Sequence, residues 1–201
     1  MTGHMLNDRS SALSLLKTRR SGRPREMVAP GPSDDELRQI LEIAMRVPDH
    51  GKLAPWRFVI VGKDQRKQLA LLLRRALQEE DPCAGPAHHE KADQFARQGE
   101  ALVVLVSTPV PEHKIPVWEQ ELSAGAAAMN LLHAGHAMGY VGGWITGWEA
   151  YSPKVNAAFA SPASVSQVSS ISARPDASWR SGRGPIPRKL FGNGTHLPID
   201  P

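Results

Sequence analysis

The chain has 201 residues, which suits one domain whose core is large enough to enclose a small cofactor. Apolar residues make up 41% and charged residues 22%, the composition of an ordinary soluble globular protein. The longest apolar run, residues 122–132, is too short to span a membrane. The first residues lack the apolar core of a secretory signal, and one cysteine excludes a disulfide framework. We therefore expect a cytoplasmic protein with no membrane partner.

The net charge of +4 comes mainly from the end of the chain. Residues 1–159 have a balance of +1, and residues 160–201 have a balance of +3. The main part of the chain has no basic stripe that could follow a phosphate backbone. We expect no nucleic-acid partner.

Hydrophobic periodicity predicts alternating helices and strands as far as residue 159. Ser33 and Glu36 form a capping box before an amphipathic helix that Pro48 ends. Residues 101–107 are apolar throughout, which is typical of a strand covered on both faces. Ser152 and Pro153 suit the start of a last helix. The other predicted helices cover residues 12–19, 65–80, 90–98 and 118–140, with a loop over 81–89, and the other predicted strands cover residues 56–61 and 141–148.

From residue 160 the composition changes. The last 42 residues contain 8 Ser, 6 Pro and 4 Gly and show almost no apolar periodicity, which is typical of a disordered segment. We therefore divide the chain into a folded domain, residues 1–159, and a basic tail, residues 160–201. Because burying serines without partners is costly, we expect the tail to stay mobile, to form no central strand and to leave a sheet edge bare.

Four short motifs stand out. They are Arg19-Arg20-Ser21 followed by Arg23, Arg46-Val-Pro-Asp-His50, Pro55-Trp56, and Gly142-Gly-Trp-Ile-Thr-Gly147. Each alone has a structural explanation: arginines complement a helix C-terminus, Pro-Asp-His ends a helix, Pro-Trp begins a strand, and Gly-Gly-Trp makes a tight turn.

Together, in this order and spacing, the motifs resemble the nitroreductase family, and most closely its small bacterial NAD(P)H nitroreductases. The likeness covers about residues 13–159 and includes the helix beginning Trp-Glu-Gln-Glu at residue 118. It implies an α+β fold in which helices flank a mostly antiparallel sheet, and a homodimer with FMN at its interface. It also implies hydride transfer from NAD(P)H through FMN to a small-molecule acceptor, such as a nitroaromatic or a quinone.

The resemblance assigns Arg19, Arg20 and Ser21 to the FMN phosphate and ribityl chain. Paired guanidinium groups and a hydroxyl group suit a phosphate, because they present forked donors to it. Arg23 matches a cation near the N1/O2 edge of the flavin, which would stabilise the reduced ring, although some relatives lack this cation.

Further positions follow from the same resemblance. Arg46 and His50 match contacts to the FMN of the other subunit, although His50 also suits a simple helix stop. A segment lying along the flavin and a stretch associated with the nicotinamide cofactor complete the expected site. These are Trp144, Ile145 and Thr146 for the first, and Gly135, His136, Ala137, Met138, Gly139 and Tyr140 for the second.

No metal site or nucleophilic side chain is expected beside these residues. His88 and His89 lack further ligands at metal spacing, and Cys83 has no activating basic neighbour. Glu119 and Glu121 face different sides of a helix and form no catalytic pair. Two other functions stay open: an inactive member whose altered tail prevents dimer and flavin assembly, and a flavin-binding protein with other chemistry, such as flavin breakdown or sensing.

The tail has a possible origin in its reading frame. Codons exist for residues 160–175 that, read from the third base of the Ala160 codon, encode Leu-Ala-Gly-Glu-Arg-Val-Ala-Gly-Phe-Val-Tyr-Leu-Gly-Thr-Pro. This run resembles the family's last strand, which the present frame lacks. We hypothesise that residues 160–201 are a frameshift product. Sequencing the gene around the Phe159 and Ala160 codons tests this, and a neighbouring frame without the family ending would refute it.

Overall fold

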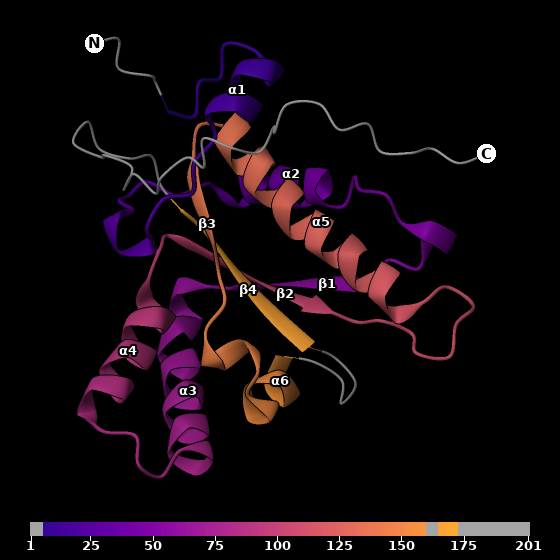
Figure 1. The fold of residues 1–201 in the computed structure, drawn as a ribbon. Helices are drawn as coiled ribbons and strands as arrows, with labels where there is room; N and C mark the ends of the chain where they lie inside the picture. The colour runs from indigo at the N-terminus through magenta and orange to yellow at the C-terminus, as the bar shows by residue number, and fades with distance from the viewer. Residues whose placement is uncertain (1–5, 160–164, 173–201) are drawn as a thin grey trace, which may run out of the picture.

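The computed structural model describes residues 6–159 and 165–172, and shows an α+β fold (Figure 1). Helices and strands alternate along most of the chain, as the periodicity predicts. The strands are β1 (Trp56–Val61), β2 (Ala101–Ser107), β3 (Val141–Ile145) and β4 (Val165–Ser172). The helices are α1 (Ala12–Thr18), α2 (Asp34–Ala44), α3 (Arg66–Glu80), α4 (Pro86–Arg97), α5 (Val117–Ala137) and α6 (Pro153–Phe159), with short 3-10 turns η1 (Pro24–Glu26), η2 (His50–Lys52), η3 (Lys63–Gln65) and η4 (Trp148–Ala150).

Local capping decides where the helices begin. At α2 the predicted capping box forms: the Ser33 hydroxyl accepts the Glu36 N–H at 3.3 Å, and the Glu36 carboxylate accepts the Ser33 N–H at 2.9 Å. At α6 the Ser152 hydroxyl accepts the Val155 N–H at 3.1 Å. The predicted start of α4 is wrong by four residues, because Gly85 and Pro86 form its N-cap and first position.

The four described strands form one antiparallel sheet in the order β1-β2-β4-β3. Trp56 of β1 pairs with Ser107 of β2, and Val141 of β3 pairs with Ser172 of β4. Every residue of β2 is buried, which confirms the prediction of a strand covered on both faces. The predicted mostly antiparallel sheet is likewise confirmed.

Strand β4 corrects one prediction about the tail. We expected no central strand after residue 159, but residues 165–172 pair with β2 along its whole length and with β3 on the other side. The backbone explains the difference: each residue brings one N–H and one C=O, which a ladder satisfies whatever the side chain is. Our predictions for residues 160–164 and 173–201 lie outside the described residues.

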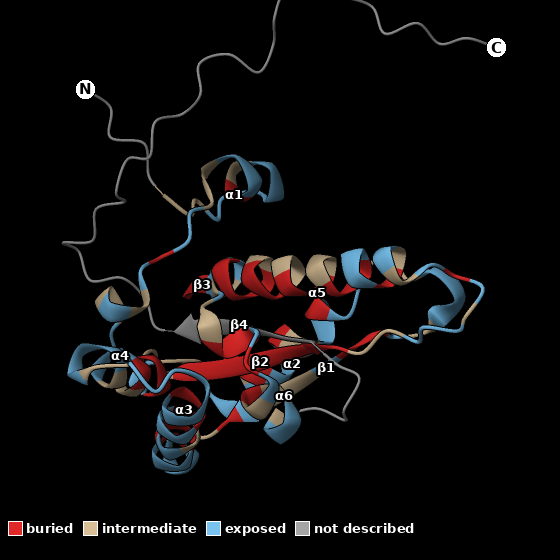
Figure 2. Ribbon diagram, turned by 60° about the horizontal axis from the view of Figure 1, so that its bottom comes forward, coloured by how far each residue is buried: buried red, intermediate tan, exposed pale blue. Residues whose placement is uncertain are grey.

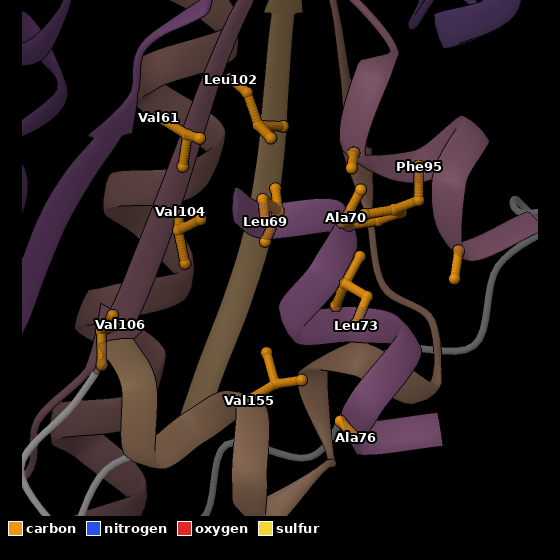
Figure 3. Close-up of a cluster of buried hydrophobic side chains, with 12 residues drawn as sticks. Val61, Leu69, Ala70, Leu73, Ala76, Phe95, Leu102, Val104, Val106 and Val155 are labelled. Carbon is orange, nitrogen blue, oxygen red and sulfur yellow. The ribbon is translucent and has the colours of Figure 1, made fainter. Parts of the chain in front are cut away.

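Helices cover both faces of the sheet, with α5 on one side and α3 and α6 on the other (Figure 2). Alternate residues of β2 point into the two cores. Leu102, Val104 and Val106 belong to a buried cluster with residues of α3, α4 and α6, as Figure 3 shows, whereas Val103 belongs to a cluster with residues of α2 and α5. No helix in the described part of the chain combines the length and apolarity that crossing a membrane requires.

Arg66 joins three elements on the α3 side of the sheet. Its side chain is buried and donates to the carbonyl oxygens of Val61 at 3.1 Å, Ala96 at 3.1 Å and Gln98 at 3.0 Å. The last carbonyls of a helix have no partner within the helix, so this guanidinium supplies the partner that the end of α4 needs. Burial lowers the pKa of Arg66.

Replacing Arg66 by Met should lower the free energy of unfolding by about 3 kcal/mol, because it leaves several buried carbonyl groups without donors. Urea unfolding at fixed protein concentration measures this. Arg75→Met, at an exposed position of the same helix, is the matched control and should change stability by less than about 0.5 kcal/mol. Equal effects of the two substitutions would contradict the proposed capping role.

Candidate functional site

The loop after α1 lies tightly against the edge strand β3. The Gly22 N–H donates to the Gly142 carbonyl oxygen at 3.1 Å. A Cβ atom at Gly22 would lie 2.3 Å from Cγ1 of Val141, and one at Gly143 would lie 2.9 Å from the Gly22 carbonyl oxygen. Only glycine permits this approach. The chain therefore holds residues 19–22 beside β3.

This loop carries the consecutive residues Arg19, Arg20 and Ser21, which the resemblance assigns to the FMN phosphate and ribityl chain. Nη1 of Arg19 lies 3.5 Å from the Ser21 hydroxyl, and the Arg20 N–H donates to Oδ1 of Asn7 at 2.8 Å. Burial and the neighbouring Arg20 charge both lower the pKa of Arg19. No carboxylate in the described part of the chain forms an ion pair with either arginine. The cluster is thus suited to an anion.

The edge of β3 that faces away from β4, which no other described strand covers, adds main-chain hydrogen-bonding groups to this cluster. Gly142 accepts from Gly22 and donates to Nε2 of His136 at 3.4 Å, so its peptide groups point away from β4. Two residues further along the strand, the peptide groups of Trp144 face the same side. The Trp144 side chain is 37% exposed and lies over Gly125 of α5. Ile145 packs into the opposite core, and Thr146 is exposed.

His136 is fully buried behind β3. Burial, the Arg19 charge and the His133 charge lower the pKa of His136 to about 4, so the ring is neutral at pH 7 and accepts the Gly142 N–H. Its Nδ1 has no hydrogen-bond partner among the described residues. In the rest of the predicted nicotinamide stretch, Gly135 and Tyr140 are buried, Ala137 is exposed, and Met138 and Gly139 are half-buried.

Arg46 and His50 belong to a second group of residues along α5. The Ser123 hydroxyl donates to the Pro48 carbonyl oxygen at 2.6 Å, and Nδ1 of His50 lies 2.7 Å from Oε1 of Glu119. Asn130 holds the segment at its other end, through the Arg46 carbonyl oxygen at 3.4 Å. The His50–Glu119 pair was missed by the sequence analysis, because the two residues lie 69 positions apart and no local pattern joins them.

The structure does not bring all the predicted site residues together within one chain. His50 contacts Glu119 near the start of α5, whereas Arg19 lies near His133 in its last turns. A helix rises about 1.5 Å per residue, so these two positions are about 21 Å apart. Arg23 turns toward Glu26, with an ion pair of 3.0 Å. Within residues 6–159 no three metal-ligating side chains cluster, and Cys83 is free and exposed.

The chain is thus an α+β domain in which a cationic loop, residues 19–22, lies against the outer strand β3 of the described sheet. A model of the Nitroreductase family matches residues 16–171. The chain belongs to the nitroreductase family.

Relatives and solved structures agree with this assignment. A protein of Haemophilus influenzae named "Putative NAD(P)H nitroreductase" is 39% identical over 137 residues, which cover 68% of this chain and 72% of that protein. A nitroreductase-like protein from Bacillus cereus has a TM-score of 0.74 at 20% identity, covering 92% of this chain and 97% of that one. A Bacteroides fragilis nitroreductase with bound FMN has a TM-score of 0.65 at 17% identity, covering 94% and 98%. At these identities the two structures show a shared fold.

Stability should fall as the pH is lowered from about 6.5 toward 4, because the unfolded chain binds a proton at His136 in this range and the folded chain does not. The loss should be about 2 kcal/mol between pH 7 and pH 5, and should reach about 3 kcal/mol only near pH 4. Urea unfolding at pH 7 and pH 5 measures it. His136→Gln keeps an acceptor for Gly142 and should remove most of the pH dependence, whereas His89→Gln should retain it. The same loss in all three proteins would argue against this origin.

Proposed function

We propose that this chain is an FMN-dependent oxidoreductase that uses NAD(P)H to reduce a nitroaromatic, a quinone or a related small molecule. The observation that carries the proposal is the cluster of Arg19, Arg20 and Ser21, which has no described carboxylate partner and lies beside a free strand edge. Membership of the nitroreductase family supports it. The nitroreductase from Bacteroides fragilis, which shares the fold, binds FMN.

The residues present fit FMN at both of its ends. Arg19 and Arg20 would hold the phosphate through charge-assisted hydrogen bonds, with the Ser21 hydroxyl as a further donor. The peptide groups of Trp144, on the free edge of β3, offer a donor and an acceptor to the polar edge of the flavin ring. When bound, FMN would supply hydride acceptance from NAD(P)H and hydride donation to the acceptor.

The roles of this chain follow from its geometry. The loop of residues 19–22, called the phosphate loop below, is fixed relative to the strand edge by the Gly22–Gly142 hydrogen bond. Both ends of the cofactor would therefore meet rigid groups. The neutral His136 ring holds the Gly142 amide without placing another positive charge in the core. Arg23 is paired with Glu26 at 3.0 Å in this chain, so it would have to leave that pair before its charge could favour the reduced, anionic flavin.

A homodimer would complete the site. Within one chain His50 lies about 21 Å along α5 from the Arg19 cluster. A two-fold axis across α5 would place the His50 end of one protomer near the Arg19 end of its partner. The exposed apolar side chains on α5 support such an interface, because Trp118 and Leu122 are 61% and 65% exposed. The exposed free thiol of Cys83 is compatible with a reducing, cytoplasmic location.

Absorbance spectroscopy tests the proposal. Purified protein should carry a flavin spectrum, or acquire one with added FMN, and NADPH or NADH should bleach it. Replacing both Arg19 and Arg20 by Ala should weaken FMN binding about 100-fold or more, since each charge-assisted hydrogen bond contributes about 1.5–3 kcal/mol.

The matched control is Lys67→Ala with Arg75→Ala, which removes the same charge from exposed positions of α3. It should keep the wild-type affinity for FMN. Unchanged affinity in the Arg19/Arg20 variant would refute the phosphate assignment. A wild-type protein that binds no flavin would instead refute the proposed function and favour an inactive family member.

A further inference from the structure

A second cationic feature lies next to the proposed flavin site. Turn η1 and helix α4 enclose a cleft of about 740 Å³, whose lining includes Arg23, Arg25 and Arg97. The chain reaches this cleft directly from the phosphate loop: Gly22 is fixed to β3, and Arg25 follows three residues later. Consecutive Cα atoms are 3.8 Å apart, so the Cα atom of Arg25 lies at most about 11 Å from that of Gly22.

The two carboxylates in the cleft leave its positive charge largely uncompensated. Asp93 is held by Arg74 of α3, with Nε of Arg74 2.6 Å from Oδ1, and this pair lowers the pKa of Asp93. Glu90 accepts a hydrogen bond from Nε2 of Gln94 at 3.2 Å. Asp93 is paired with Arg74 outside the cleft lining and also interacts electrostatically with Arg97, so the three arginines still outnumber the two carboxylates of the cleft.

Two of the three arginines have no described counterion. Arg23 is paired with Glu26 at 3.0 Å. Arg25 and Arg97 are exposed, and neither forms an ion pair with a carboxylate in residues 6–159. Arg97 comes from the last turn of α4 and Arg25 from η1, so one anion between the two elements could contact both.

Gln98 supplies an independent indication of a ligand. It lines the same cleft, and its side-chain Nε2 is buried without a hydrogen-bond partner among the described residues. Buried donors nearly always have partners, and a rotation of the Gln98 side chain toward the cleft would give this donor an acceptor on a bound anion. Phosphate oxygens are such acceptors, and guanidinium groups bind them with two parallel hydrogen bonds.

We propose that the cleft formed by Arg25, Arg97 and Gln98 binds the 2′-phosphate of NADPH, so that the protein prefers NADPH to NADH. This inference rests on the proposed function. The two nucleotides differ only in that phosphate, and a nearby arginine is the usual means of accepting it. Arg23 connects the two sites, since it lines the cleft and follows the phosphate loop.

Two measurements test the inference. The first compares the affinities of the wild-type protein for adenosine 2′,5′-bisphosphate, adenosine 5′-monophosphate and inorganic phosphate by calorimetry, which does not require bound flavin. We expect the bisphosphate to bind at least about tenfold more tightly than the monophosphate or inorganic phosphate. Added salt should lower its affinity. The second is the ratio of kcat/KM for NADPH to kcat/KM for NADH in the FMN-loaded protein.

Replacing both Arg25 and Arg97 by Ala should lower that ratio about tenfold or more, with kcat/KM for NADH nearly unchanged. Gln98→Ala should lower the ratio by a smaller factor. Lys67→Ala with Arg75→Ala removes equal charge from α3 and should leave the ratio unchanged. Circular dichroism of each variant checks that it folds.

The contrary results would overturn either this inference or the proposed function. Equal affinities for the bisphosphate and the monophosphate would overturn the inference, as would an unchanged ratio in a folded Arg25/Arg97 variant. Inorganic phosphate binding as tightly as the bisphosphate would show a general anion site and also overturn it. Absence of flavin binding would refute the proposed function, whereas the calorimetric comparison would still decide whether the cleft recognises the phosphate.

Discussion

The length of α5 is the constraint on which the site depends. This rigid helix holds the Arg46–His50 segment through the side chains of Glu119, Ser123 and Asn130, and its last turns pack behind the Arg19 cluster. A helix cannot shorten, so the separation of the two groups is set once α5 has formed. The same helix also covers one face of the sheet, which means that the core and the site are built on one element.

The close contact between the loop of residues 19–22 and β3 is the second requirement. An edge strand normally leaves its outward N–H and C=O groups to water or to another chain. Here Gly22 and His136 satisfy both groups of Gly142, whereas at Trp144 no described residue closes the edge. A buried histidine can serve this purpose only while it is neutral, and the nearby Arg19 charge helps to keep it so. The charge of Arg19 and the protonation state of the buried His136 are therefore linked.

The sequence predicted those parts of the fold that local patterns determine. Periodicity and caps located α2 and α6, and a continuous apolar run located β2, because these signals lie within one element. Pairings across long separations were missed: no pattern joins His50 to Glu119, or Arg66 to the carbonyl groups at the end of α4. Strand β4 was missed for a different reason, since backbone pairing can place a serine-rich segment in a ladder that side-chain hydrophobicity alone does not predict.

The place of β4 in the sheet affects how the protein folds during synthesis. It is the last described strand along the chain, yet it lies between β2 and β3 and joins them. Until the ribosome has released residues 165–172, β2 has an open edge and β3 has no strand to pair with. The pairing of β3 with the sheet would therefore form late, after the helices of both layers have been made. A nascent chain of this design leaves one edge of its central strand unpaired until its last described strand has been made.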